Sequence, residues 1–225
     1  MTAVVTGASR GIGRAIALRL AAAGDEVALW ARDGAALAGV VAEIAAAGGH
    51  ARAFTVDVSD AAAVNAAAEA VRAAMSPVTI LVNNAGAVVR KATVELSDAD
   101  WRHVMAVCLD GTFFVTRALL PDLIGGGRII NIASRAGREG TPMLAAYCAA
   151  KHGVVGLTRS LAEELRAAKV CVNAICPGSV DTEMLREGIP GASPDMTPDD
   201  IASAVVFLAH GAPAALTGTC IDIYG

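Results

Sequence analysis

A glycine-rich turn separates the first apolar run of the chain from its first helix-forming run. It reads Thr6-Gly7-Ala8-Ser9-Arg10-Gly11-Ile12-Gly13. A turn without side chains lets the backbone approach a pyrophosphate, and the N-terminus of the following helix offers free N–H groups to its negative charge. Strand, glycine turn and helix in this order therefore predict a dinucleotide-binding βαβ unit, with a tight turn that holds no ligand as the alternative.

Short apolar runs alternate with alanine- and leucine-rich runs of helical period along the whole chain. The apolar runs do not alternate with polar residues, which is typical of strands buried on both faces of a parallel sheet. Repeated βα units favour one doubly wound α/β domain over residues 1–225, with helices on both faces. We expect strands at Ala3–Thr6, Glu26–Ala31, Ala51–Val56, Val78–Val82, Gly127–Ile132, Lys169–Ile175 and Thr219–Ile223. We expect helices at Gly11–Ala23, Gly34–Ala47, Ala61–Met75, Asp98–Ile124, Leu144–Ala168 and Pro198–Ala209.

Residues between and beside these elements give further local predictions. Gly24 and the pair Gly48-Gly49 stand where helices end, and Ser97 and Thr197 stand where N-caps belong. The segment Thr182–Thr197 has no strong periodicity, so we expect it to form a substrate-side loop.

Composition excludes several classes of function. The formal net charge is −4, so there is no basic surplus for binding nucleic acid. We expect no bilayer-spanning segment, because no apolar stretch is long and charge-free enough. We also expect no signal peptide, because the N-terminus has no charged region followed by an apolar one. The five cysteines are scattered and odd in number, which favours reduced thiols in the cytoplasm over disulfides. The four histidines show no ligand spacing, so no metal site is expected.

The end of the second strand should read the adenosine ribose of a dinucleotide. An acid there favours a free 2′-hydroxyl, whereas an arginine favours a 2′-phosphate. Arg32 is placed to form a bidentate contact with a phosphate, and Arg10 in the glycine turn could add a second cation. These residues favour NADP(H), while Asp33 keeps NAD(H) open as the alternative. A solvated loop cation is the other interpretation of Arg32.

Tyr147 and Lys151 are four residues apart on one predicted helix and share a face. Carbonyl reduction requires a proton on the substrate oxygen, and a phenol with a pKa near 10 exchanges protons slowly at neutral pH. A nearby ammonium would lower the pKa of the Tyr147 phenol, and Ser134 would hydrogen-bond the oxygen on which charge develops. Without this context, Tyr147 and Lys151 would be read as a pair on a helix surface.

In these motifs the chain resembles the short-chain dehydrogenase/reductase family over nearly its whole length. The resemblance rests on Thr6–Gly13, Asn83-Asn84-Ala85-Gly86, Ser134, the Tyr147/Lys151 pair, and Pro177-Gly178 with Thr182. It implies a Rossmann-like sheet in strand order 3-2-1-4-5-6-7, with Ser134, Tyr147 and Lys151 as the catalytic residues. It also implies that Asp57-Val58 contacts the adenine and that Lys151 holds the nicotinamide ribose. The cofactor-binding residues it implies are Gly7, Ser9, Arg10, Gly11, Ile12, Gly13, Arg32, Asp57, Val58, Asn83, Ala85, Gly86, Tyr147, Lys151, Pro177, Gly178, Val180 and Thr182.

The expected reaction is hydride transfer between NADP(H) and a ketone or secondary alcohol. A 3-oxoacyl thioester would suit the modestly apolar segments Val88–Thr93, Ala136–Leu144 and Thr182–Thr197, and so would many small ketones. An NAD-linked alcohol or sugar dehydrogenase is one alternative. A nucleotide-binding sensor or scaffold is another, because Cys108 stands where family members usually carry an asparagine. The resemblance also implies a homodimer or homotetramer built through the two long helices.

Overall fold

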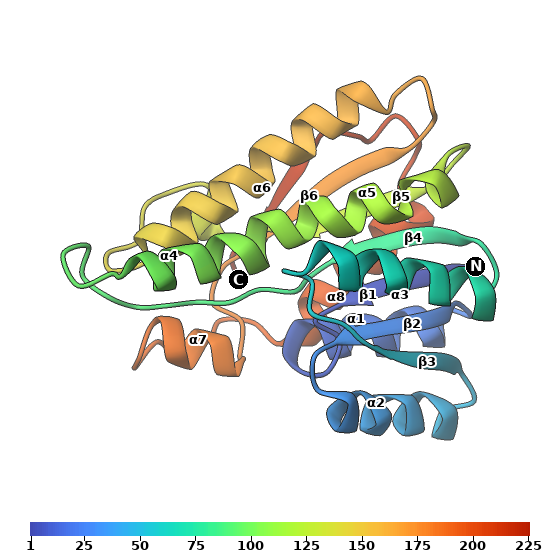
Figure 1. The fold of residues 1–225 in the computed structure, drawn as a ribbon, viewed down its shortest axis with the longest axis horizontal. Coiled ribbons are helices and arrows are strands. Elements are labelled where there is room, and N and C mark those ends of the chain that lie inside the picture. The colour runs from blue at the N-terminus through green and yellow to red at the C-terminus, as the bar shows by residue number, and fades with distance from the viewer.

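Seven parallel strands form one sheet in the order β3-β2-β1-β4-β5-β6-β7 (Figure 1). The structure is a computed structural model that describes residues 1–225. This strand order confirms the predicted doubly wound sheet, and each predicted strand is present with its ends moved by two residues or fewer. The strands are β1 (Thr2–Thr6), β2 (Glu26–Ala31), β3 (His50–Thr55), β4 (Val78–Asn83), β5 (Arg128–Ile132), β6 (Cys171–Pro177) and β7 (Cys220–Ile223).

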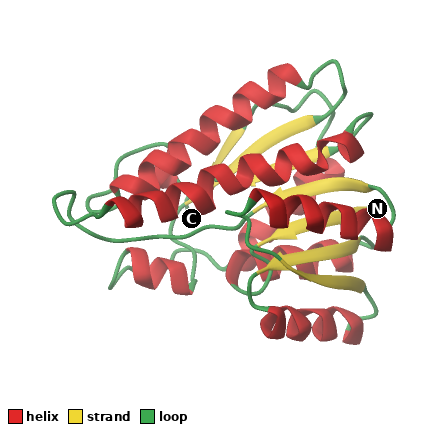
Figure 2. Ribbon diagram, in the orientation of Figure 1, coloured by secondary structure: helices red, strands yellow, loops and turns green.

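Helices cover both faces of the sheet (Figure 2). One apolar cluster joins one face to α1, α2 and α8, and a second joins the other face to α3, α5 and α6. The helices are α1 (Gly11–Ala22), α2 (Gly34–Ala46), α3 (Ala61–Ala74), α4 (Asp98–Met105), α5 (Gly111–Leu123), α6 (Ala145–Glu164), α7 (Glu183–Gly188) and α8 (Pro198–Val206).

The predicted helix boundaries rest on local chemistry that the structure shows. Ser97 caps α4 by accepting from the Asp100 N–H at 3.1 Å, while the Asp100 carboxylate accepts from the Ser97 N–H. Thr197 and Asp200 form the same capping box at α8. Gly24 and Gly48 have positive φ just beyond α1 and α2, as residues in left-handed helix ends do. These predictions are confirmed.

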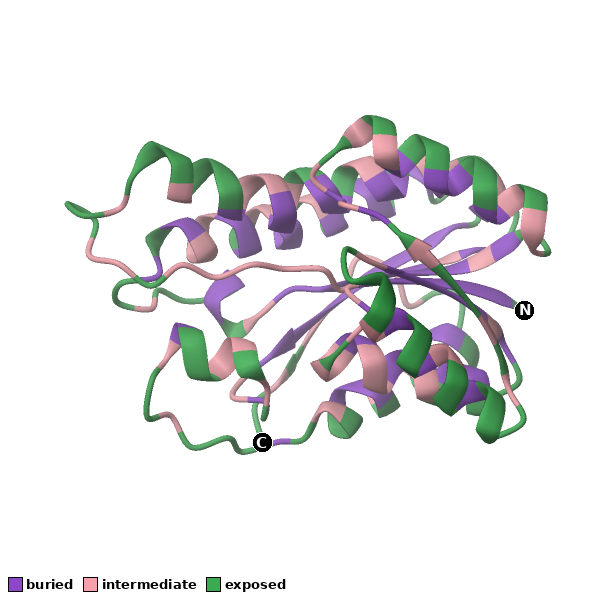
Figure 3. Ribbon diagram, turned by 60° about the horizontal axis from the view of Figure 1, so that its bottom comes forward, coloured by how far each residue is buried: buried purple, intermediate pink, exposed green.

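Burial is concentrated in the middle of the sheet (Figure 3). Every residue of β1 and of β6 is buried, whereas no residue of the edge strands β3 and β7 is. The expectation that all strands are buried on both faces is therefore wrong for the two edges. An edge strand has a neighbouring strand on one side only, and β3 packs mainly against α2, so its residues remain partly or fully exposed.

Two helical segments differ in kind from the expectation, and the predicted helix Leu144–Ala168 ends earlier, at Glu164. The predicted helix Asp98–Ile124 is α4 and α5 joined by a π-helical turn, Ala106–Asp110, centred on Cys108. The predicted loop Thr182–Thr197 contains the short helix α7, which Thr182 caps by accepting from the Leu185 N–H at 3.1 Å. In Figure 1, α7 lies apart from the two helical layers, beyond the carboxyl ends of the strands.

The segment Asp98–Leu123 is also apolar and long enough to cross a bilayer by length and composition, which contradicts the expectation that no segment is. Its apolar character has a local cause. The helix packs against the sheet and α3, and its side chains Val115, Leu119 and Leu123 belong to the second apolar cluster. A core helix of this kind passes the same compositional test as a membrane span.

Candidate active site

A cavity of about 890 Å³ opens at the carboxyl ends of the strands, the place where ligands bind in open α/β sheets. The glycine turn after β1 and the ends of β2 to β6 line its inner walls, and α7 lines its mouth. Its volume is in the upper part of the range for small-molecule sites, about 300–1,000 Å³. The cavity includes all but two of the residues that the sequence assigns to cofactor binding.

The glycine turn is shaped by close backbone approach. Gly7 and Gly11 have φ of +65° and +54°, which side chains disfavour. A Cβ atom on Gly13 would lie 2.2 Å from the Gly7 carbonyl oxygen. Gly13 does not line the cavity, so the expectation that it contacts a ligand is corrected: its missing side chain lets α1 pack onto the turn.

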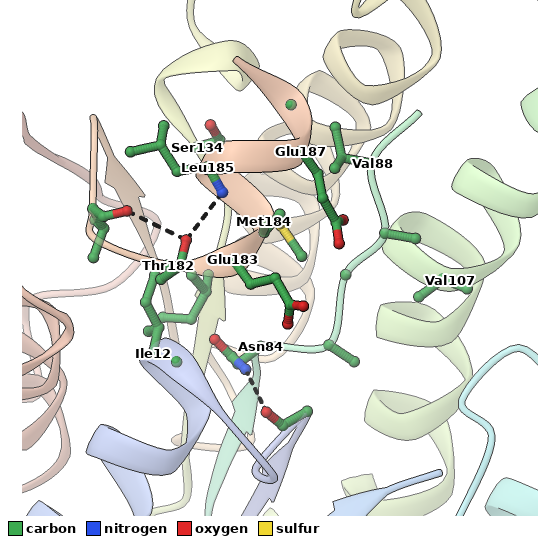
Figure 4. A pocket seen from close by; sticks show the side chains of 18 of the residues that line it. Ile12, Asn84, Val88, Val107, Ser134, Thr182, Glu183, Met184, Leu185 and Glu187 are labelled. Carbon is green, nitrogen blue, oxygen red and sulfur yellow. Dashed lines mark hydrogen bonds between the residues drawn. The ribbon is translucent and has the colours of Figure 1, made fainter. Parts of the chain in front are cut away.

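The asparagine pair after β4 divides its roles in a way that the sequence did not show. Asn83 is buried, and its Nδ2 donates to Thr116 Oγ1 and Asn131 Oδ1, both at 2.9 Å. Contrary to the expectation, Asn83 therefore does not line the cavity. Asn84 lines the cavity instead, and its Nδ2 donates to the Thr6 and Gly7 carbonyl oxygens at 3.0 and 3.3 Å (Figure 4). Alternation of side chains along a strand could have indicated that the two asparagines face opposite ways.

At the far end of the cavity, Arg32 is exposed and forms no ion pair. The neighbouring Asp33 is already engaged, because its Oδ1 caps α2 by accepting from the Ala36 N–H at 3.0 Å. Hydrogen bonds from Ser59 hold the pKa of Asp57 below its usual range, so this cavity residue is ionised at neutral pH. Arg10 pairs with Glu183 of α7.

Three candidate catalytic residues meet at the opposite end. Ser134 follows β5, and Tyr147 and Lys151 lie one turn apart on α6. The Lys151 Nζ is buried and donates to the Ile132 carbonyl oxygen at 2.7 Å, and it lies 5.7 Å from the centre of the Tyr147 ring. Glycine permits this packing, since a Cβ atom on Gly137 would lie 2.6 Å from the Lys151 carbonyl oxygen. The structure thus brings the predicted trio into one wall of the cavity.

Burial changes the pKa of both titratable candidate catalytic residues, Tyr147 and Lys151. It raises the pKa of the Tyr147 phenol, and the neighbouring Ser134 hydroxyl opposes this only in part. Burial also lowers the pKa of the Lys151 ammonium. The sequence analysis expected the lysine to lower the pKa of Tyr147. The structure shows the opposite direction: the loss of hydration raises the pKa of Tyr147, so the phenol stays protonated at neutral pH.

Comparisons with known proteins agree with this geometry. The family model for short chain dehydrogenases matches residues 1–191. This chain belongs to the short-chain dehydrogenase family. It is 39% identical to a D-threitol dehydrogenase of Mycolicibacterium smegmatis, with 99% of this chain and 91% of that protein covered. It is also 39% identical to a 3-oxoacyl-[acyl-carrier-protein] reductase of Synechocystis, with 99% and 95% covered. The crystal structure of an actinorhodin polyketide ketoreductase variant with NADPH aligns with a TM-score of 0.93 at 37% identity, covering 100% of this chain and 95% of that one.

Cys108 departs from the asparagine usual in this dehydrogenase family, and the structure shows what its thiol does. The buried Sγ lies 3.2 Å from the Ala87 nitrogen and 3.3 Å from the Ala87 oxygen, so it can accept from one and donate to the other. The Cys108 carbonyl oxygen accepts from Thr112 Oγ1 at 2.9 Å. The thiol therefore ties the π-helical turn to the segment after β4, beside Tyr147.

Apolar side chains form one part of the substrate-side wall of this dehydrogenase. Val88, Leu144, Met184, Leu185 and Ile189 line it, and Figure 4 shows α7 facing the Val88 segment. The three segments that the sequence analysis assigns to the substrate carry four cations, of which Arg186 lines the cavity, paired with Asp181. The others are engaged elsewhere: Arg90 with the Gly188 oxygen, Lys91 with Asp100, and Arg138 with Asp222. The sequence analysis missed the lining residues His103, Val107 and Ser179, which carry no motif, whereas Glu183 and Glu187 lie in the predicted segment Thr182–Thr197.

Proposed function

We propose that this short-chain dehydrogenase uses NADP(H) to interconvert a ketone and a secondary alcohol, with Ser134, Tyr147 and Lys151 as its catalytic residues. One observation carries the proposal. The serine after β5 and the tyrosine and lysine of α6 line one wall of the same cavity whose other end is the glycine turn. A reducing dinucleotide held along this cavity would present its reactive end to Tyr147.

The residues around the cavity fit a dinucleotide. The positive-φ glycines Gly7 and Gly11 leave the turn without side chains in front of the N-terminus of α1, which suits a pyrophosphate. Asp57 and Val58 would border the adenine, and Lys151 would hold the nicotinamide ribose. The backbone of Pro177-Gly178, with Val180 and Thr182, would border the nicotinamide ring. The remaining cofactor contacts would come from Ser9, Ile12, Ala85 and Gly86.

The bound cofactor would supply the hydride, and the chain would manage the proton. The protonated Tyr147 phenol donates its proton to the substrate oxygen in reduction, and the phenolate accepts it back in oxidation. Ser134 donates a hydrogen bond to that oxygen, which stabilises the charge that develops there. The Lys151 ammonium lies beside the ring and favours the phenolate once the proton has left.

Two features support NADP(H) over NAD(H). Arg32 carries no ion pair and lies on the cavity, so its guanidinium is available to a 2′-phosphate. Asp33 would be the ribose reader of an NAD-linked enzyme, but one of its two carboxylate oxygens, Oδ1, already caps α2. One structural neighbour with a bound cofactor, the polyketide ketoreductase, contains NADPH. An NAD-linked alcohol or sugar dehydrogenase remains the second candidate, favoured by the D-threitol dehydrogenase likeness.

The apolar substrate wall favours a ketone with an apolar body, a class that includes 3-oxoacyl thioesters. A polyol would place hydroxyl groups against Val88, Leu144 and Met184 without partners, which costs about 1–3 kcal/mol per buried group. The intact Ser134, Tyr147 and Lys151 argue against a sensor or scaffold without turnover. A cytoplasmic location is consistent with five cysteines that are all unpaired.

A homodimer or homotetramer through α4–α5 and α6 belongs to the same proposal. Trp101 of α4 and Phe113 of α5 are exposed to 42% and 41%, a large apolar area for a helix surface. A second copy of the chain would cover them. Light scattering should give a multiple of the 22.6 kDa chain mass at micromolar concentration, and a monomer would end this part of the proposal.

The test begins with separate NADPH and NADH titrations, followed by fluorescence. We expect NADPH to bind at least tenfold more tightly, about 1.4 kcal/mol, and Arg32→Gln to remove most of that margin. Purified protein is then given NADPH with a small apolar ketone, a 3-oxoacyl thioester or a ketose. Turnover of the first two supports the proposal. Turnover of the sugar with NADH alone supports the second candidate, and no binding of either nucleotide contradicts both.

A further inference from the structure

An ion pair joins the two sides of the cavity mouth. Arg10 in the glycine turn pairs with Glu183 in the first turn of α7, 173 positions further along the chain. Thr182, the N-cap of α7, lies close to the same turn: a Cβ atom on Gly11 would be 3.4 Å from its Cγ2. In the free chain, α7 therefore rests against the glycine turn, and Figure 4 shows the Glu183 carboxylate in the cavity.

This ion pair occupies one of the two cations that would read a 2′-phosphate. Arg32 is unpaired, so it is available to the phosphate at no cost, but Arg10 must give up Glu183 before it can turn to a new anion. NADP(H) carries the 2′-phosphate and NAD(H) does not. A competitor for Arg10 therefore weakens binding of one cofactor and leaves the other nearly unaffected.

We propose that Glu183 sets the cofactor preference of this chain by competing with the 2′-phosphate of NADP(H) for the Arg10 guanidinium. The inference rests on the proposed function, since it needs a dinucleotide in the cavity. Glu183 acts here as a specificity-determining residue: it moderates the preference for NADP(H) that Arg10 and Arg32 would otherwise impose.

The expected size of the effect is modest because both side chains are solvated. The Arg10 side chain is 70% exposed and that of Glu183 is 54% exposed. Solvated ion pairs are weak, so removal of Glu183 should tighten NADPH binding by about two- to fivefold. The same exposure makes the effect sensitive to salt, and it should shrink strongly at about 1 M salt, where the screening length is about 3 Å.

The test uses dissociation constants for NADPH and NADH in the intact protein, measured by fluorescence without substrate. The variants are Glu183→Gln, Arg10→Gln and the double variant. Glu187→Gln is the matched control, because Glu187 lies one turn further along α7 and lines the same cavity without an ion pair. We expect Glu183→Gln to tighten NADPH two- to fivefold and to leave NADH unchanged. Glu187→Gln should leave the ratio of the two constants unchanged, and in the Arg10→Gln background Glu183→Gln should have no effect.

Three results would overturn the inference. If Glu183→Gln weakened the binding of both cofactors equally, the ion pair would act by closing over the pyrophosphate that both share. An unchanged NADPH constant in a protein that does prefer NADPH would mean that Arg10 does not read the phosphate. The same tightening by Glu187→Gln would mean that the effect comes from the loss of any negative charge near the cavity and not from the ion pair. Failure of the proposed function is distinguishable, since the wild-type protein would then bind neither nucleotide.

Discussion

The two ends of the cavity are built by different means. At the glycine turn, position is set by backbone: Asn84 holds the Thr6 and Gly7 carbonyl oxygens, and Gly13 has no room for a side chain. At the substrate side, α7 is six residues long and is held by the ion pairs of Glu183 and Arg186 and by the Arg90 contact. These ties are solvated and individually weak.

The contrast follows from what each end has to recognise. A pyrophosphate is constant, so a rigid backbone cradle beside fully buried strands can serve it without adjustment. A substrate varies, and a short helix on weak ties can shift with little loss of stability. Substitutions at the rigid end should therefore change stability as well as binding, whereas substitutions at α7 should change binding alone.

The largest effect is expected at the catalytic wall formed by Ser134, Tyr147 and Lys151. Tyr147→Phe removes the proton donor and should lower kcat by about 10²–10⁴-fold, with little change in cofactor affinity. Steady-state kinetics measures kcat, and cofactor titration measures the dissociation constant of the cofactor. Tyr224→Phe, which changes the only other tyrosine, is the control and should keep most of the activity. A Tyr147→Phe enzyme with more than a tenth of the wild-type rate would contradict the assigned role.

The protonation of this wall gives a second test. Burial raises the pKa of Tyr147, so the phenol must stay protonated in the free protein until pH rises above the usual value of about 10. The phenolate absorbance of wild type minus that of Tyr147→Phe should therefore stay near zero from pH 6 to about pH 10. A phenolate signal below pH 9 would show that Lys151 outweighs burial, as the sequence analysis expected.

The rigidity of the glycine turn is tested by stability. Gly13→Ala places a Cβ atom against the Gly7 carbonyl and should lower the free energy of unfolding by about 1–3 kcal/mol. Gly39→Ala is the matched control on α2, where a Cβ atom meets nothing within 4 Å. It should raise stability by about 0.4–1 kcal/mol. Urea unfolding measures the free energy of unfolding of both variants. Equal changes would mean that the glycine turn is no more rigid than an ordinary helix.

The smallest effect is expected at Cys108. Because its thiol already bonds the Ala87 backbone, Cys108→Asn should change kcat by less than about threefold, under 0.7 kcal/mol, and leave the pH profile unaltered. Cys108→Ala leaves the Ala87 N–H without that partner and should cost about 1 kcal/mol of stability. A tenfold gain in kcat for Cys108→Asn would instead mean that the missing amide limits proton transfer.

Local sequence patterns predicted most of the framework. Short apolar runs located every strand to within two residues at either end, and capping residues such as Ser97 and Thr197 marked the helix starts. The patterns failed where the outcome depends on distant neighbours. The apolar residues of β3 did not indicate that it is an edge strand. The segment Glu183–Gly188 has too few residues to show a helical period.

The sequence by itself determined the strands, the glycine turn and the identity of the candidate catalytic trio, because apolar runs, turn chemistry and an i, i+4 spacing are local properties; the strand order followed from the family resemblance. Only the tertiary structure decided which asparagine faces the cavity and that the Cys108 thiol bonds the Ala87 backbone. It alone showed that burial governs Tyr147 and that Arg10 is engaged by Glu183. Hydrogen-bond partners and hydration depend on residues far apart in the chain, and no local pattern encodes which of them the fold brings together.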